Sequence, residues 1–181
     1  MVYVFLADGF EEIEALTPID ILRRAGVSVT SVGVTGKTVT GSHGISVEAD
    51  VTESEAADAL SRADIEAVVL PGGMPGADNL NASSVVEKYI SAKDCGAFIA
   101  AICAAPYILG IRGMLSGKMA TCFPGFEDRL EGAQYYDCDV IRDGEIITGR
   151  AMGAATEFSL ELVDAIKGES AAKEMREKIL A

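Results

Sequence analysis

The chain has 181 residues, of which 49% are hydrophobic, and its formal net charge is −13 at pH 7. This length suits one well-cored domain, and we expect a single domain over residues 1–181 because the composition does not break along the chain. The negative charge argues against nucleic acid or an anionic membrane as a partner, since both bind clustered Lys and Arg.

The N-terminus and the cysteines indicate a cytoplasmic protein. The first eight residues reach an acidic side chain without a basic region, which is typical of a strand and not of a signal peptide. No apolar run approaches the roughly 20 residues that span a membrane. The four cysteines form no Cys-x-x-Cys pair, and one histidine cannot complete an ordinary Cys/His zinc site. We therefore expect reduced thiols and no bound metal.

The first part of the chain predicts a β-α-β unit followed by a small excursion. Apolar runs predict strands over 2–7, 27–34 and 67–70, and apolar spacing predicts helices over 11–25 and 53–63. Segment 36–50 alternates β-forming residues with Gly and Ser and predicts a small hairpin. The third strand runs into Pro71-Gly72-Gly73, a loop whose glycines let backbone N–H groups face a ligand closely.

The remaining elements continue the alternation. We expect a helix over 83–94 capped by Ser83 or Ser84, a buried strand over 97–102, a short strand over 118–121, a hairpin over 140–147, and helices over 154–167 and 169–180. Apolar strands alternating with helices argue for a mostly parallel sheet with helices on both faces. Ligands of such sheets bind beyond the carboxyl ends of the strands, where segments 8–14 and 71–76 and Cys103 converge.

Cys103 lies on the turn between a buried strand and a helix. A nucleophile at such an elbow is exposed, and the N–H of the next residue, Ala104, is placed to bind an oxyanion. The helix N-terminus also favours thiolate over thiol. Gly73, after the neighbouring strand, would complete an oxyanion hole with Ala104, although a tight turn alone also explains a glycine. A small buried side chain is the commoner fate of a free cysteine, so this stretch alone leaves both roles open.

Glu14 is the carboxylate that we expect beside the elbow. The helix dipole and a solvated face explain Glu11 and Glu12. Glu14 is rotated about 200° from Glu12 on the helix, and it tilts toward the strand ends if Ile13 and Leu16 pack on the sheet. A carboxyl beside a thiolate is held protonated, because two anions resist sharing a pocket. It can then donate a hydrogen bond to sulfur and move protons in catalysis.

Five motifs carry a resemblance to a known family. They are Phe10-Glu-Glu-Ile-Glu14, Pro18-Ile-Asp-Ile-Leu-Arg-Arg-Ala-Gly26, Leu70-Pro-Gly-Gly73, Ala101-Ile-Cys-Ala-Ala-Pro106 and Thr148-Gly-Arg-Ala-Met-Gly153. In this order, and in register from residue 1 to about residue 167, they resemble the ThiJ/PfpI family. Within that family they are most similar to the DJ-type subgroup, which includes the parkinsonism-associated deglycase.

The resemblance implies a flavodoxin-like three-layer sandwich, usually assembled as a homodimer. It implies that Cys103 is the nucleophile, that Glu14 hydrogen-bonds it, and that Gly73 and Ala104 are the oxyanion donors. The family is credited with cofactor-free glyoxalase and deglycase chemistry on methylglyoxal and its protein adducts. It is also associated with redox sensing through oxidation of the cysteine and with chaperone-like protection.

Three positions depart from the family pattern. Ala105 replaces the usual glycine after Cys-Ala. Phe123 stands where the family often places a histidine before a proline, and it cannot transfer a proton, so weak activity is expected. His43 stands where relatives carry an arginine near the active site. We expect His43 to be a solvated loop residue; the alternative hypothesis brings it to the Cys103 pocket, from the partner subunit, to bind an anionic substrate.

Two functions follow for Cys103. In the first, it attacks methylglyoxal or a glycated protein without any cofactor, and Glu14 transfers the protons. In the second, an exposed cysteine of low pKa is oxidised to a sulfinic acid that Glu14 hydrogen-bonds, and the protein is a redox sensor or a chaperone-like stress protein. Class I glutamine amidotransferases fit less well, because they need a histidine downstream of the cysteine and none follows Cys103.

Overall fold

A seven-stranded sheet in the order β10-β11-β7-β6-β1-β2-β5 forms the centre of the computed structural model, which describes residues 1–60 and 64–181. Neighbouring strands pair in parallel, except for the antiparallel pair β10–β11 at one edge. The mostly parallel sheet predicted from the sequence is therefore confirmed. Its strands are β1 (Val2–Leu6), β2 (Val29–Gly33), β5 (Val51–Thr52), β6 (Ala67–Leu70), β7 (Phe98–Ile102), β10 (Val140–Asp143) and β11 (Ile146–Gly149).

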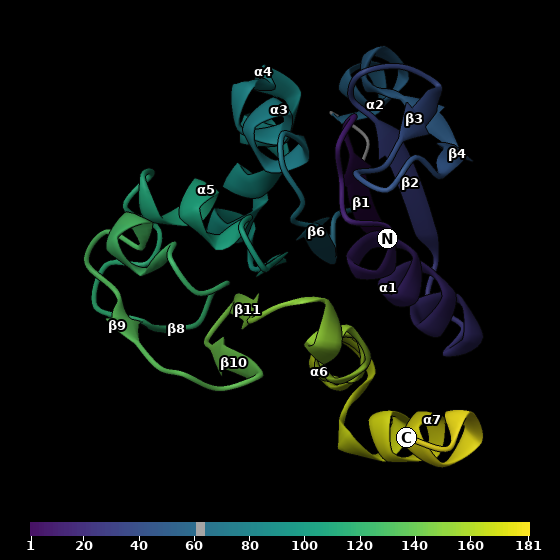
Figure 1. Cartoon of the computed structure of the whole chain (residues 1–181). Coiled ribbons are helices and arrows are strands. Elements are labelled where there is room, and N and C mark those ends of the chain that lie inside the picture. Colours follow the sequence, from purple (N-terminus) through teal and green to yellow (C-terminus); the bar gives the residue numbers. More distant parts are fainter. Residues whose placement is uncertain (61–63) are drawn as a thin grey trace.

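Helices cover both faces of this sheet, as Figure 1 shows. On one face, α1 (Glu12–Arg24), α6 (Ala155–Lys167) and α7 (Glu169–Ile179) share a core with one set of strand residues. On the other, α2 (Glu53–Ala59), α3 (Gly76–Ala82), α4 (Ser84–Ile90) and α5 (Pro106–Gly110) share a second core. This is the flavodoxin-like three-layer sandwich expected from the resemblance. None of the helices in the described residues has the length and apolar character that crossing a membrane requires.

Several predicted elements appear close to their expected bounds. The strand over 67–70 is β6, and the excursion over 36–50 contains the antiparallel hairpin of β3 (Thr38–Thr40) and β4 (Ser46–Glu48). Ser83 caps α4, because its hydroxyl accepts the N–H groups of Val85 and Val86. The hairpin over 140–147 is β10–β11, and β11 also pairs in parallel with β7. The helix expected over 53–63 ends at Ala59, and the last three of those residues lie outside the described ranges.

Other elements differ from the prediction. Helix α3 was not predicted: we expected only a loop over 71–76, which contains its first residue, Gly76, because glycine is common in turns. Gly76 is required there because a Cβ would lie 2.5 Å from the backbone nitrogen of Phe10. The helix expected over 83–94 leaves α geometry after Ile90 and continues as a 3₁₀ helix, Ser91–Cys95. The short strand β8 (Met119–Ala120) pairs with an unexpected strand, β9 (Gln134–Tyr135).

Helix α1 turns a different face to the sheet from the one we expected. The side chains of Ile13 and Leu16 are exposed, and the buried face contains Glu14 itself. Because residues three and four apart share a helix face, Glu14 is aligned with the apolar residues that pack on the sheet. The Glu14 side chain is therefore part of the buried face of α1 and does not reach the strand ends from an exposed face. The buried residues of α1 are Glu12, Glu14, Ala15, Pro18, Ile19, Ile21 and Leu22.

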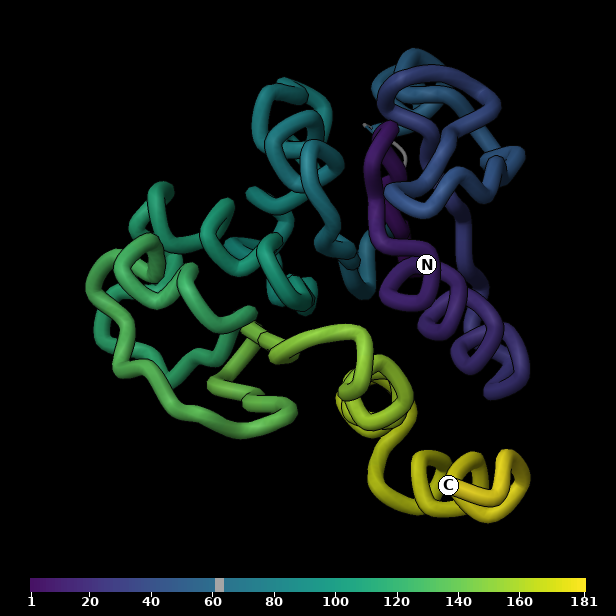
Figure 2. The backbone as a smooth tube through the Cα atoms, viewed as in Figure 1, coloured from purple at the N-terminus to yellow at the C-terminus, as the bar shows by residue number. Residues whose placement is uncertain are grey.

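The C-terminal helix extends the layer that contains α1 and α6. Figure 2 shows α7, in yellow, lying outside α6 near the end of the chain. Arg176 of α7 forms a two-pronged ion pair with Glu157 of α6, and Met175 is buried in the shared core. The helix is thereby fixed to α6.

Candidate active site

Cys103 occupies a strained turn between β7 and α5. Its φ is 64°, and among the described residues other than glycine only Leu180 shares a positive φ. Its N–H donates to the Gly149 carbonyl at 2.9 Å, and its carbonyl accepts the Phe123 N–H at 2.8 Å. Strained backbone held by its surroundings is concentrated at functional sites. The turn has the geometry that we predicted for a nucleophile elbow, while the nucleophilic role itself stays a prediction.

Glu14 is only 1% exposed and lies against this elbow. Its Oε2 accepts the N–H of Gly72 at 2.9 Å. Its Oε1 is buried and, among the described residues, has no hydrogen bond of ordinary geometry. The Cys103 thiol is nevertheless close enough for hydrogen bonding with the carboxyl to lower its pKa. Catalytic hydrogen bonds are often long in the absence of substrate, so Oε1 is free to receive a proton during reaction.

Burial dominates the acid–base behaviour of the pair. It raises the pKa of Glu14 to about 7, although the hydrogen bonds with Cys103 and the Gly72 N–H oppose the change. Burial, followed by the charge of Glu14, raises the pKa of Cys103 to about 12. The expectation of a low-pKa thiol is therefore wrong, because desolvation and the neighbouring carboxylate outweigh the elbow's N–H groups. In this resting site Cys103 is a thiol beside a carboxyl that titrates near neutral pH.

Two backbone N–H groups face the sulfur of Cys103. They belong to Ala104 and Gly73, and their hydrogen bonds lower the pKa of the thiol. The loop approaches closely because Gly72 has no side chain: a Cβ there would lie 2.7 Å from both Cys103 Cβ and Glu14 Oε2. The structure thus brings Gly73 and Ala104 together with Cys103 and Glu14. The requirement for Gly72 was not predicted, although its place in a Gly-Gly pair signals a close approach.

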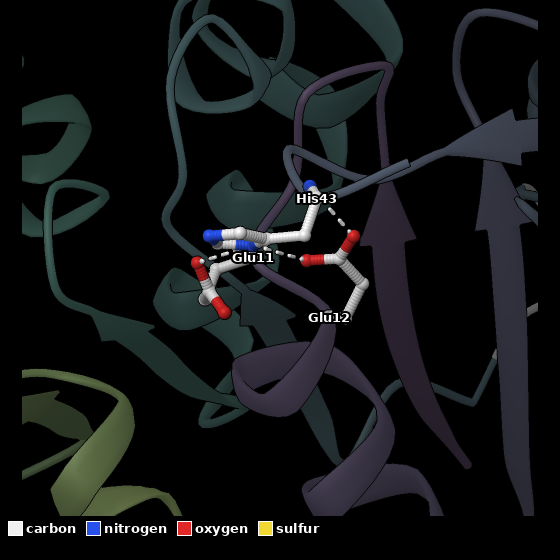
Figure 3. Close-up of side chains that lie close together, drawn as sticks. All are labelled: Glu11, Glu12 and His43. Carbon is white, nitrogen blue, oxygen red and sulfur yellow. Dashed lines mark hydrogen bonds and ion pairs between the residues drawn. The ribbon is translucent and has the colours of Figure 1, made fainter. Parts of the chain in front are cut away.

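His43 lies in the turn of the β3–β4 hairpin and contacts the start of α1 (Figure 3). Its side chain is 68% exposed, as expected of a loop residue, but it is not free. Its Nδ1 lies 3.0 Å from Glu12 Oε2 and 3.6 Å from Glu11 Oε2. The hydrogen bond to Glu12, followed by the charges of Glu11 and Glu12, raises the pKa of His43. The hypothesis that His43 reaches the Cys103 pocket of a partner subunit stays a prediction.

Glu12 is not the solvated residue that we expected. It is 4% exposed, and its Oε1 accepts the N–H of His43 at 2.8 Å and that of Ile45 at 3.4 Å. Burial raises the pKa of Glu12, but the hydrogen bonds from His43 and Ile45 outweigh it and hold the pKa at about 2. The carboxylate therefore fastens the hairpin turn to the start of α1.

The same side chains form a group that could share a cation. Glu11, Glu12 and His43 each offer a ligand atom, and these atoms lie within 4.8 Å of one another. Their hydrogen bonds and ion pairs already account for the arrangement shown in Figure 3. The expectation that the protein binds no metal stays a prediction.

Comparison with known proteins identifies the family of the chain and agrees with its fold. The family model described as the DJ-1/PfpI family matches residues 1–165. The chain belongs to the DJ-1/PfpI family. Protein dj-1beta of Drosophila melanogaster is 35% identical over 181 residues, which are 98% of this chain and 95% of that protein. The deglycase PH1704 of Pyrococcus horikoshii is 33% identical over 166 residues, with coverage of 89% and 96%.

Solved structures of the DJ-1 family share the whole fold. The oxidised DJ-1 of Toxoplasma gondii superposes with a TM-score of 0.91 at 34% identity, covering 99% of this chain and 97% of its own. Against the family pattern, Phe123 remains the clearest departure. Its backbone N–H contacts the elbow, and the residue is 44% exposed. An apolar residue therefore follows Cys122 at the position where a proton-transfer group is often found in the family.

Proposed function

We propose that the protein is a cofactor-independent, cysteine-dependent glyoxalase or deglycase that acts weakly on methylglyoxal or its protein adducts. One observation carries the proposal: the buried Glu14 carboxyl, with a pKa near 7, lies against Cys103 on a strained elbow. A base that titrates near neutral pH is suited to moving protons at the operating pH. The name of the related deglycase supports the same class of substrate.

The first step is addition of the thiol to the aldehyde. The Cys103 sulfur forms a bond to the aldehyde carbon of the 2-oxoaldehyde while Glu14 takes the thiol proton. The aldehyde oxygen becomes an alkoxide and receives the N–H groups of Gly73 and Ala104. Glu14 then returns the proton to that oxygen, which gives a neutral hemithioacetal. Because Glu14 receives the proton only as sulfur attacks, this step needs no resting thiolate.

The second step moves hydrogen between two carbons. Glu14 removes the proton from the carbon bonded to sulfur, an enediolate forms, and the proton is delivered to the adjacent carbon. The product is a thioester of a 2-hydroxy acid, and water cleaves it to release lactate and regenerate the Cys103 thiol. Phe123 supplies no second proton-transfer group, so Glu14 makes every transfer. This is the physical reason for the weak activity that we propose.

A second candidate function is sensing or protection through oxidation of Cys103. The related DJ-1 of Toxoplasma gondii is known in an oxidised form, which favours this candidate. A disulfide with Cys103 would need a second thiol close by, and Cys122 is the candidate. Cys122 packs in the core beneath α2–α5, whereas Cys103 packs against the core beneath α1 and α6. These opposite faces argue against a Cys103–Cys122 disulfide. Oxidation of Cys103 would then continue to the sulfinic acid.

Lactate formation from methylglyoxal separates the two functions. We expect wild type to form lactate and Cys103→Ser to form none, because a hydroxyl is a far weaker nucleophile at this site. Cys95→Ser is the matched control, since Cys95 is exposed and lies outside the site. Equal rates of lactate formation in wild type and Cys103→Ser would rule out the proposed cysteine-dependent enzymatic function. A gain of two oxygens under mild peroxide, lost only in Cys103→Ser, would support the sensor.

We also propose that the protein works as a homodimer in the cytoplasm. The dimer is suggested by apolar side chains exposed near the site, which include Ile13, Leu16 and Ile45. The cytoplasm is suggested by four cysteines that are all free thiols. Its proposed partners are thus a second copy of the chain and a small 2-oxoaldehyde or glycated protein.

A further inference from the structure

Tyr107 joins the two segments that carry the proposed oxyanion donors. It lies four residues after Cys103, in α5, and its side chain is fully buried. Its hydroxyl donates to Asp78 Oδ1 at 2.6 Å and lies 3.4 Å from the carbonyl oxygen of Ala77. Both partners belong to α3, the helix that follows the Gly72-Gly73 loop. The Tyr107 side chain therefore connects α5, which follows the Cys103 turn, to α3, which follows the glycine loop.

Backbone hydrogen bonds continue this connection to the donors themselves. The N–H of Ala77 donates to the Gly73 carbonyl at 2.9 Å, and the N–H of Tyr107 donates to the Ala104 carbonyl at 3.2 Å. The path from Gly73 to Ala104 thus runs through Ala77, the Tyr107 hydroxyl and the Tyr107 backbone. Each link is a hydrogen bond or a covalent segment of one helix turn. This chain of contacts, which we call the clamp, connects Gly73 to Ala104 through Ala77 and Tyr107.

The ring of Tyr107 is itself held in place. The guanidinium carbon of Arg129 lies 3.6 Å from its centroid, and the ring of Phe126 stacks at a centroid distance of 6.2 Å. Burial, followed by the bond to Asp78, raises the pKa of the Tyr107 hydroxyl to about 12, so it remains a donor at neutral pH. A packed ring whose hydroxyl finds its acceptors on α3 has few alternative positions.

We propose that Tyr107 and Asp78 are positioning residues, which set the separation of the Gly73 and Ala104 N–H groups around the Cys103 sulfur and the developing oxyanion. The role at the oxyanion rests on the proposed function. The role at the resting sulfur does not, because both N–H groups already interact with the thiol. Donors misplaced by a fraction of an ångström stabilise charge less, since this stabilisation depends on preorganised geometry.

The test compares Tyr107→Phe with Tyr89→Phe. Tyr89 is a matched control, because it is also fully buried and its hydroxyl donates to the Ala56 carbonyl at 2.9 Å, away from the site. Two readouts are measured: kcat and KM for lactate formation, and the pH profile of Cys103 alkylation by iodoacetamide, followed by peptide mass. We expect Tyr107→Phe to lower kcat about tenfold with KM changed less than about twofold, since the donors act mainly in the transition state.

The alkylation profile supplies the second expected result. It moves to higher pH in Tyr107→Phe, because loosened N–H groups stabilise the thiolate less. Tyr89→Phe loses thermal stability but leaves both readouts at wild-type values. Asp78→Ala reproduces the effect of Tyr107→Phe, and the double variant is no worse than either single one. Asp78→Asn, whose amide oxygen still accepts a hydrogen bond, restores most of both readouts.

Two outcomes overturn the proposal. One is a Tyr107→Phe protein with wild-type kcat and an unmoved alkylation profile, which would leave Tyr107 a structural residue only. The other is an equal change in Tyr89→Phe, which would reduce the effect to general loss of stability. If wild type forms no lactate, the proposed function fails while the alkylation profile still decides the clamp. Asp78 is exposed, so Asp78→Ala decides it if Tyr107→Phe does not fold.

Discussion

At Glu14 and Cys103, burial raises the pKa of both groups. The charge of Glu14 raises the pKa of Cys103 further, whereas the hydrogen bond with Cys103 lowers the pKa of Glu14. The pair therefore releases one proton near pH 7 and holds the second far more firmly. A site of this kind carries a base and a nucleophile together, with the proton passing between them only during reaction. The chemistry follows from the two environments and not from an intrinsically acidic thiol.

The raised pKa of Glu14 predicts how stability depends on pH. The ordinary value of 4.5 applies to the unfolded chain and about 7 to the folded one, so the folded protein binds the proton more tightly. Its contribution is complete below about pH 4.5 and is lost as the pH rises through 7, a change of about 3 kcal/mol. Urea unfolding of wild type should show this fall, and Glu14→Gln should lack it. Parallel curves for the two proteins would contradict the raised pKa.

Some site residues could be predicted from the sequence and others could not. Cys103 and Gly73 stand at strand ends, where local pattern and parallel-sheet topology suffice to place them. The burial of Glu12 depends on His43, which lies 31 residues away and folds onto it. The separation of Tyr107 from Asp78 is 29 residues, with no local signal for their contact. Contacts of this range depend on loop geometry, which composition and spacing do not record.

At the scale of elements, the start of α1 and the β3–β4 hairpin form one unit. The Glu12 carboxylate accepts hydrogen bonds from the N–H groups of the hairpin turn, which would otherwise have no acceptor. Gly41 is needed at the contact, because a Cβ there would lie 2.3 Å from Glu12 Oε1. The unit also contains the backbone hydrogen bond from the Glu11 N–H to the Gly72 carbonyl. The hairpin, α1 and the glycine loop of the site are therefore connected.

Removal of the Glu12 carboxylate should loosen this unit. We expect Glu12→Ala to lower the free energy of unfolding by about 2 kcal/mol, because buried N–H groups lose their acceptor. The amides of His43 and Ile45 should exchange hydrogen faster, whereas Glu11→Ala, whose carboxylate accepts neither amide, should leave them unchanged. Because the pKa of Glu12 is about 2, this stabilisation is present above about pH 4.5 and is lost as the pH falls toward 2. Unchanged exchange in Glu12→Ala would contradict the anchoring role.

Element type was easier to predict than element orientation. The apolar spacing of α1 was sufficient to predict a helix, but Ile13 and Leu16 misled us about its buried face. Helical periodicity tolerates more than one apolar stripe when some apolar residues remain on the surface. Helix α3 was missed because its glycine serves close packing and not a turn. In both cases the deciding contacts are tertiary.

For the whole molecule, the exposed apolar residues of α1 and the hairpin indicate a surface for association. Ile13 and Ile45 are 44% and 55% exposed, and the Ile45 N–H contacts Glu12 beside Ile13. Light scattering should give twice the chain mass for wild type. Ile13→Asp should shift it toward the monomer, since a charge in an apolar interface is costly to desolvate. Asp94→Asn, a change on a distant 3₁₀ helix, is the control; a monomeric wild type would contradict the proposed dimer.

The most direct test of the proposed chemistry is the rate of lactate formation by wild type and Glu14→Gln across neutral pH. If the Glu14 carboxylate is the base, the wild-type rate rises as the pH passes through about 7. Glu14→Gln, which keeps the shape but cannot accept the proton, should be slower by about 100-fold or more. A Gln variant as fast as wild type, with the same pH profile, would contradict the assignment of the chemistry to the Cys103–Glu14 pair.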